Sequence, residues 1–417
     1  MDLIEARQLA SRVTVNLGSE RVRVEEALGR IIAESVVAGR NLPAEDRSHL
    51  DGYALCHADT HVATLERPIA IKIVHGRIAA GHDAAVHTHS GECVRILTGA
   101  PLPRSADAVA PQEEVVVEGE NLILRRPYSR GNGVMPSGED VRKDELVLSR
   151  GEVLTPTRLA FVVALGYETV VVFQQPHVAL LATGDEVRAL GKGEAGPFTY
   201  CNNLYLLSWL TMIQGGKPHV LGVAGDEPSL IADLLRGAEA NLVITTGGTG
   251  KGDRDFIFEV WKLLGIETLF NGINLTPGKN TALGVKDGKV FLAVPGNPWA
   301  AQIVFEQLAV PMLRRWQGLE EPSNAMITAK LKETVKHKPG FYKAVRGTLS
   351  LESVPPRFSP AQTKSTSVFN RIRDSFAYVI LAPHVVEVAE GDKVEVHLVD
   401  FPMLASPLFR KSASVQG

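Results

Sequence analysis

The chain has 417 residues, which at roughly 150 residues per domain predicts about three domains. Apolar residues make up 45% and charged residues 22% of the sequence, the ordinary mixture of a globular protein, so the composition excludes a chain that is disordered throughout. The 44 basic and 47 acidic residues nearly cancel to a net charge of −3, which excludes the strongly basic surface that binding to nucleic acid or an anionic membrane requires.

The first forty residues predict two helices. Apolar residues recur at helical spacing over 3–13, and a second apolar stripe follows over 22–38. Pro43 ends this pattern. Residues 141–172 are interpreted as a return to the same layer, with a helix through 159–165 that begins at the sequence Thr-Pro-Thr.

Two regions predict small β domains, one from about 44 to 140 and one after the polar linker that begins at Gln317. Glycine and proline interrupt the first region often, which is typical of short strands and turns. The β-type runs are at 69–73, 115–117 and 122–124 in the first region and at 377–381 and 394–398 in the second.

Residues 173–317 predict a doubly wound α/β domain. Apolar runs occur at 178–182, 219–224, 242–245 and 290–294. They alternate with helical patterns at 202–213, 228–237, 256–264 and 298–315. Strands separated by helices of this length indicate a parallel sheet, and the continuously apolar runs are typical of strands covered on both faces.

The cysteines and the hydropathy of the sequence indicate the cellular compartment of the protein. The cysteines, Cys56, Cys93 and Cys201, are odd in number and far apart, so they predict neither a disulfide framework nor a CxxC metal site. No apolar run approaches the roughly 18 residues of a membrane span. The acidic start at 1–7 is unlike a signal peptide. We therefore expect a cytoplasmic protein that binds neither membrane nor nucleic acid.

Glycine-bearing loops follow the predicted α/β strands. Ligands of open α/β sheets bind beyond the carboxyl ends of the strands, and the loops there are 183–186, 225–227, 246–255, 276–279 and 294–298. Glycine turns that lead into helices present backbone N–H groups to an anion. Acidic side chains beside them would repel a phosphate unless a cation lies between, so Glu186, Asp226 and Asp255 indicate Mg²⁺. The edge predicts a site for a phosphorylated small molecule and a divalent metal.

Simpler structural roles compete with this interpretation. Asp185 and Asp226 can each be the N-cap of a following helix, and Asp51-Gly52 can be a hairpin turn. Because 246–255 is neither a Walker A loop nor a GxGxxG motif, its glycines alone favour structural turns. The histidines at 49, 75, 82, 87 and 89 lack tight metal spacing, which favours surface or packing roles over zinc binding.

Short motifs occur in a fixed order along nearly the whole chain. In the first β region they are Ser48-x-x-Asp-Gly-Tyr-Ala54, Thr98-Gly-Ala-x-Leu-Pro103, Ala106-Asp-Ala-Val109 with Gln112-Glu113, and Gly138-Glu-Asp140. In the α/β region they are Thr183-Gly-Asp-Glu186, Thr246-Gly-Gly-Thr249 with Gly252 and Asp255, Pro277-Gly-Lys279, and Pro295-Gly-Asn-Pro298. With these motifs the sequence resembles the molybdopterin molybdenumtransferase family, the MoeA proteins and the E domain of gephyrin.

The resemblance implies a fold of four parts and a reaction. The parts are an elongated helical domain (1–43 and 141–172), a β domain (44–140), a doubly wound α/β molybdopterin-binding domain (173–318) and a C-terminal β-barrel (319–417). It also implies a homodimer whose active sites lie between the α/β domain of one subunit and the β domain of the other. The implied reaction inserts molybdate into adenylylated molybdopterin and releases AMP in a Mg²⁺-dependent step.

The resemblance assigns roles to single residues. Asp51 and Thr98 would face the cleft of the partner subunit. Glu186, Asp226 and Asp255 would handle the metal and the pyrophosphate, and Lys279 would stabilise anionic oxygens. Gly247, Gly248 and Thr249 would form the loop for the pterin phosphate, and Pro295, Pro298 and Arg346 would complete the substrate site. This set suits the reaction, because cleaving a pyrophosphate needs charge neutralisation and positioning more than a strong base.

Some positions depart from the family pattern. They are Thr276 in place of a lysine, 132–137 in place of an arginine-bearing segment, 200–202 at a helix opening, and 362–366, where Lys364 would restore the missing charge. The alternatives that stay open are a non-catalytic dimeric scaffold and a paralogue that prefers tungstate. An adenylyltransferase module that uses ATP would lack the motifs of the β domain.

Overall fold

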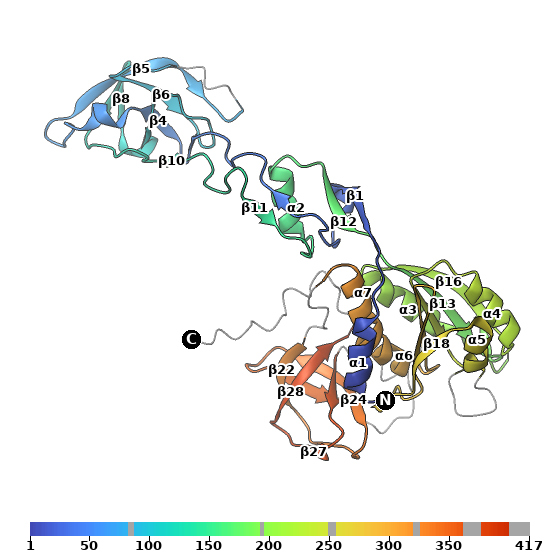
Figure 1. Cartoon of the computed structure of the whole chain (residues 1–417). Helices are drawn as coiled ribbons and strands as arrows, with labels where there is room; N and C mark the ends of the chain where they lie inside the picture. The colour runs from blue at the N-terminus through green and yellow to red at the C-terminus, as the bar shows by residue number, and fades with distance from the viewer. Residues whose placement is uncertain (82–86, 192–195, 249–255, 320–325, 362–376, 400–417) are drawn as a thin grey trace. The chain divides into compact units, whose positions relative to one another are not determined.

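The structure, a computed structural model, describes residues 1–81, 87–191, 196–248, 256–319, 326–361 and 377–399. The described residues divide into two compact units (Figure 1). One lies within 1–34, 150–156 and 169–417, and the other within 35–149 and 157–168. The four-domain boundaries expected from the sequence stay a prediction. None of the described helices has both the length and the apolar character that crossing a bilayer requires.

A six-stranded sheet lies at the centre of the first unit. Its order is β16 (Lys217–Ala224), β13 (His177–Thr183), β17 (Leu242–Thr246), β21 (Lys289–Val294), β20 (Ala282–Lys286) and β18 (Glu267–Asn271). The first four strands are parallel, which confirms the parallel sheet predicted from the apolar runs. The antiparallel strands β20 and β18 extend it, and no prediction was made for them.

Helices cover both faces of this sheet, so the doubly wound architecture is confirmed. Alternate side chains of a strand point to opposite faces. Val178 and Leu180 of β13 join one apolar cluster, whereas Ala179 and Leu181 join another. The helices that contribute to the first cluster are α1 (Leu3–Arg12), α3 (Asn202–Ile213), α6 (Pro298–Val304), the π-helical turn η4 (Phe305–Ala309) and α7 (Val310–Trp316). Those of the second are α4 (Pro228–Arg236) and α5 (Ile257–Leu264).

The predicted helix over 22–38 is wrong. The chain there forms β1 (Ser19–Arg23), a 3-10 turn η1 (Val24–Glu26) and β2 (Val36–Val37). β1 pairs with β12 (Thr169–Phe173) and β2 with β11 (Leu146–Leu148). β12 is rich in valine, and β-branched residues favour extended chain. The distant partner strands therefore outweigh the local helical spacing.

The end of the described chain forms the expected β-barrel. Its strands are β24 (Tyr342–Ser350), β25 (Arg357–Pro360), β22 (Met326–Leu331), β28 (Lys393–Leu398) and β26 (Ala377–Leu381). The pairing of β26 with β24 closes the barrel around buried side chains that include Phe358, Val379 and Val396. The short strand β19 (Leu275–Thr276) pairs with β24, and β23 (Val335–Lys336) pairs with β27 (Glu387–Val388).

The second unit is built on another six-stranded sheet, which confirms the β character predicted after residue 44. The order is β7 (Ala108–Pro111), β4 (Gly52–Leu55), β6 (Glu92–Ile96), β5 (Ile69–Ile78), β9 (Asn121–Leu124) and β8 (Val116–Glu118). Apolar clusters fill both faces. The smaller elements are β3 (Arg47–Ser48), paired with β10 (Val134–Met135), the 3-10 turns η2 (His57–Thr60) and η3 (Gln112–Glu114), and the predicted helix α2 (Pro156–Ala164).

Candidate active site

The loops that follow the four parallel strands begin side by side. Thr183 at the end of β13 is in register with Ala224 of β16, and Thr246 at the end of β17 is in register with Val294 of β21. The Gly184 N–H donates to the Ala224 carbonyl at 3.1 Å. Carboxyl ends of parallel strands form the usual ligand-binding edge of such a sheet. The structure thus brings together the described parts of four of the predicted loops.

The loop that contains Lys279 reaches the same edge from an antiparallel strand. β20 begins beside the end of β21, because Ala282 is in register with Ala293. The preceding residues therefore arrive where the parallel strands end, and Lys279 is exposed there. Thr276 lies in β19 in register with Lys343 of β24, but the Lys343 ammonium donates to the Lys336 carbonyl at 3.0 Å. Lys364, proposed to replace the charge missing at 276, lies outside the described residues.

Acidic side chains of two neighbouring loops lie at this edge. Asp185 Oδ1 accepts the Asp226 N–H at 3.1 Å, which ties the loop after β13 to the loop after β16. The Glu186 carboxylate folds over Gly184, since a Cβ added there would lie 2.9 Å from Glu186 Oε2. Asp185 and Glu186 are exposed and Asp226 is half-buried. An all-oxygen set of carboxylates on short loops fits Mg²⁺. Asp255 lies outside the described residues.

The simpler roles considered for these acidic residues are wrong. The N-cap of α4 is Glu227, so Asp226 precedes the cap. The element after Asp185 is the strand β14 (Val187–Arg188), which pairs with β15 (Thr199–Tyr200), and not a helix. Asp51-Gly52 is not a hairpin turn either, because the flanking strands do not pair with each other: β3 pairs with β10, and β4 pairs with β6 and β7. Capping and turn formation therefore do not account for these side chains.

Glycines let the loop after β17 lie directly against β13. Gly247 has a φ of +103°, and a Cβ there would lie 2.3 Å from the Thr183 carbonyl oxygen. Gly248 has a φ of +64°, and its Cβ would lie 2.7 Å from the Phe256 ring. The Gly247 N–H donates to the Val294 carbonyl at 3.3 Å, so this group closes the loop onto β21. Thr249 lies outside the described residues, and binding of the pterin phosphate by 247–249 stays a prediction.

Asn203 is a site residue that sequence reasoning missed. Its amide Nδ2 donates to Thr246 Oγ1 at 2.7 Å and to the Gly296 carbonyl at 2.9 Å. The residue is only 5% exposed, and its Oδ1 is buried without a hydrogen-bond partner in the described part of the chain. A buried acceptor of this kind costs free energy unless a ligand donates to it. The sequence did contain a signal for Asn203. It lies four residues before the buried Leu207, so a polar amide stands on the apolar face of the helix.

The loop between β21 and α6 is held from both sides. Asn297 caps α6 by accepting the Ala300 N–H at 3.2 Å. Thr246 Oγ1 donates to the Pro295 carbonyl at 3.3 Å. Pro298 begins α6. The Arg346 guanidinium lies over the ring of the next residue, Trp299, 4.6 Å from the ring centroid. Arg346 is 7% exposed, so it packs beneath this loop, and its direct contact with a substrate stays a prediction.

The second unit holds the other predicted catalytic residues. Asp51 follows β3 and precedes β4, and its Oδ1 accepts the Thr98 N–H at 2.7 Å and the Thr98 hydroxyl at 2.8 Å. These two hydrogen bonds from Thr98 hold the pKa of Asp51 below its usual range. Asp51 therefore carries its negative charge at neutral pH and positions the loop that begins at Thr98.

Comparison with known proteins identifies both halves of this arrangement. Residues 1–166 match the model of the MoeA N-terminal region (domain I and II), and 179–315 match that of a probable molybdopterin-binding domain. The chain is 30% identical to the molybdopterin molybdenumtransferase of Haemophilus influenzae, over 91% of this chain and 93% of that one. It is 28% identical to that of Bacillus subtilis, over 91% and 90%. A MoeA structure from Pyrococcus horikoshii is 30% identical, covers 95% of this chain and 98% of its own, and superimposes with a TM-score of 0.84.

The fold and the loop edge thus define a protein with a molybdopterin-binding α/β domain joined to a β domain and a β-barrel. The same N-terminal region and the same order of domains recur in relatives that match almost the whole chain. The chain therefore belongs to the molybdopterin molybdenumtransferase family, and with it to the transferases of molybdenum cofactor biosynthesis.

Proposed function

We propose that this chain inserts molybdate into adenylylated molybdopterin and releases AMP in a Mg²⁺-dependent reaction. The observation that carries the proposal is the convergence of acidic, glycine-bearing and lysine-bearing loops at one sheet edge, next to the buried acceptor atom of Asn203. We also propose that the protein acts as a cytoplasmic homodimer in which each β domain completes the partner's site. Membership of the family supports this arrangement, and Asp51 and Glu186 lie in different compact units of the chain.

The acidic residues at this edge would hold the magnesium ion. Glu186 and Asp226 would provide oxygen ligands, together with Asp255, which lies outside the described residues. When bound, Mg²⁺ supplies positive charge that offsets the charge of the pyrophosphate and of the departing AMP. The exposed ammonium of Lys279 reaches the same edge from the other side and would stabilise anionic oxygens of molybdate or phosphate.

The neutral polar groups would bind and orient the pterin. Pterin rings carry N–H donors, and the Asn203 Oδ1 is a buried acceptor fixed by the two hydrogen bonds of its Nδ2. The N-cap of α3, Cys201, makes no side-chain hydrogen bond to the helix, so its side chain does not compete with an anion for the backbone N–H groups at this helix start. Asn203 would therefore hold the ring while the helix start binds a phosphate.

A turnover assay tests the proposed function. The purified full chain is incubated with adenylylated molybdopterin, Mg²⁺ and molybdate, and AMP is measured. We expect AMP release that depends on both the oxyanion and Mg²⁺, and no pyrophosphate from molybdopterin and ATP. Pyrophosphate release would favour the adenylyltransferase alternative, and no turnover would favour a scaffold. Replacing molybdate by tungstate shows which oxyanion is preferred.

Replacing Asn203 by aspartate should weaken pterin binding. Asn203→Asp keeps the shape of the side chain but removes both N–H donors and places a carboxylate against the Gly296 carbonyl. We expect the dissociation constant for molybdopterin, measured by calorimetry, to rise about 10- to 100-fold, because a carboxylate repelled by the Gly296 carbonyl no longer holds its acceptor in place for the one or two hydrogen bonds with the pterin. Asn121→Asp makes the same change at an exposed position of β9 in the other unit, and should change it less than about twofold. Equal affinities of the two variants would contradict the role of Asn203.

A further inference from the structure

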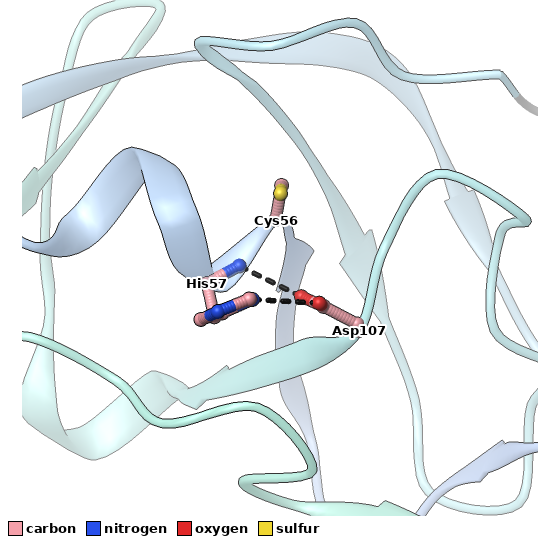
Figure 2. Close-up of side chains that lie close together, drawn as sticks. All are labelled: Cys56, His57 and Asp107. Carbon is pink, nitrogen blue, oxygen red and sulfur yellow. Dashed lines mark hydrogen bonds and ion pairs between the residues drawn. The ribbon is translucent and has the colours of Figure 1, made fainter.

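A group of potential metal ligands lies in the second unit, away from the residues assigned to the transfer reaction. Cys56 and His57 directly follow β4, and Asp107 directly precedes β7 (Figure 2). These two strands are antiparallel, with Leu55 in register with Ala108, and the Asp107 N–H donates to the Leu55 carbonyl at 3.1 Å. Strand pairing thus brings together residues that are 50 positions apart in the sequence. Asp51 lies at the opposite end of β4.

Hydrogen bonds hold the group in place. The His57 backbone N–H donates to Asp107 Oδ1 at 2.7 Å, and His57 Nδ1 lies 2.6 Å from Asp107 Oδ2. The Cys56 sulfur, a ring nitrogen of His57 and a carboxylate oxygen of Asp107 all lie within 4.8 Å of one another. The side chains of His57 and Asp107 are each 28% exposed. Hydrogen bonds thus fix His57 and Asp107, the Cys56 sulfur lies nearby, and an ion from solvent can reach the group.

We propose that Cys56, His57 and Asp107 bind one zinc ion. Thiolate, imidazole and carboxylate are the three kinds of protein ligand that zinc accepts, and three of them leave a fourth tetrahedral position for water. The thiol argues against Mg²⁺ or Ca²⁺, which prefer oxygen. The ion displaces the proton of the Cys56 thiol, because the thiolate is the form that binds the metal. The negative charges of thiolate and carboxylate then balance the ion.

The ion would fasten β7, at the edge of the sheet, to its neighbour β4. It joins the end of β4 and the start of η2 to the start of β7, which are otherwise linked there through backbone hydrogen bonds and Asp107. Arg130 lies 3.8 Å from Asp107 Oδ2 with a side chain that is 81% exposed, so solvent screening keeps its competition with the ion weak. Binding to the folded state alone raises the stability of the chain in proportion to the logarithm of the zinc concentration.

Metal titration of the full chain tests this site. After removal of metal with a chelator, calorimetry should show one Zn²⁺ bound per chain, and Zn²⁺ should raise the melting temperature. Co²⁺ in place of Zn²⁺ should produce thiolate-to-cobalt charge-transfer absorption. Cys56→Ser should abolish this absorption, and both Cys56→Ser and His57→Gln should weaken Zn²⁺ binding at least tenfold.

Two control variants locate the site. The His61 ring meets the His57 ring edge-on, with 5.4 Å between their centroids, without belonging to the group, so His61→Gln should bind Zn²⁺ as the unmodified chain does. Asp226→Asn, at the sheet edge of the other unit, should also leave Zn²⁺ binding unchanged. Circular dichroism of each variant without metal separates loss of a ligand from loss of the fold. If Cys56→Ser does not fold, the Co²⁺ spectrum of the unmodified chain and His57→Gln decide.

Three results would overturn the proposal. The first is the absence of saturable binding of one Zn²⁺ per chain. The second is binding that persists unchanged in both Cys56→Ser and His57→Gln. The third is a Co²⁺ complex of the unmodified chain without thiolate charge-transfer absorption.

Discussion

Replacing Glu186 or Asp226 by the matching amide should reduce AMP release by about 10²-fold or more, as expected for loss of one group that stabilises charge in a transition state. Glu186→Gln and Asp226→Asn keep the size of the side chains. The Asp226 N–H that donates to Asp185 belongs to the backbone and is unaffected. Each variant removes one negative charge from the proposed magnesium ligands, so the Mg²⁺ concentration needed for half-maximal rate should rise. Both quantities follow from turnover assays over a Mg²⁺ titration.

Glu227→Gln provides the matched control. Glu227 is the next residue after Asp226, it is exposed, and its Oε1 accepts the Ser229 hydroxyl at 2.8 Å. Loss of its charge should change turnover and the Mg²⁺ requirement less than about twofold. Amide variants at 186 and 226 that keep the turnover and the Mg²⁺ requirement of the unmodified chain would contradict the assignment of the metal ligands.

Gly247→Ala should be among the most destabilising single substitutions in the α/β domain. The new Cβ would lie 2.3 Å from the Thr183 carbonyl oxygen, and the backbone has a φ of +103°. The end of β17 must then move away from β13, at a cost of about 2–4 kcal/mol in the free energy of unfolding. Urea denaturation measures this cost. AMP release should fall as well, because Gly247 also closes the loop onto β21.

Gly288→Ala separates close approach from backbone strain. Gly288 lies in the turn between β20 and β21 with a φ of +74°, but an added Cβ there meets no atom within 4 Å. Its cost is that of the left-handed conformation alone, about 1 kcal/mol. If the two variants unfold at the same urea concentration, contact between the 247 loop and Thr183 is not the reason for glycine at 247.

The sequence by itself determined the four parallel strands and the helices of the α/β domain, together with the loops that carry its chemistry. Strands such as β17 are buried on both faces, so they read as continuous apolar runs, and the helices between them have a 3.6-residue period. Carboxyl ends of parallel strands share one edge, so the position of Glu186 and Asp226 at the same edge followed from the alternation of strands and helices. The ordered motifs indicated the family.

Only the tertiary structure decided the features that depend on pairing between distant segments. β1 and β2 are strands because β12 and β11 lie beside them, and their local spacing had predicted a helix. The buried acceptor atom of Asn203 is fixed in orientation because Thr246 and Gly296 accept hydrogen bonds from its Nδ2. Cys56 and His57 meet Asp107 only through the pairing of β4 with β7. The spacing of apolar residues along the chain indicates only whether a segment forms a helix or a strand. The contacts described here depend on which distant segment packs against it, and that spacing does not report this.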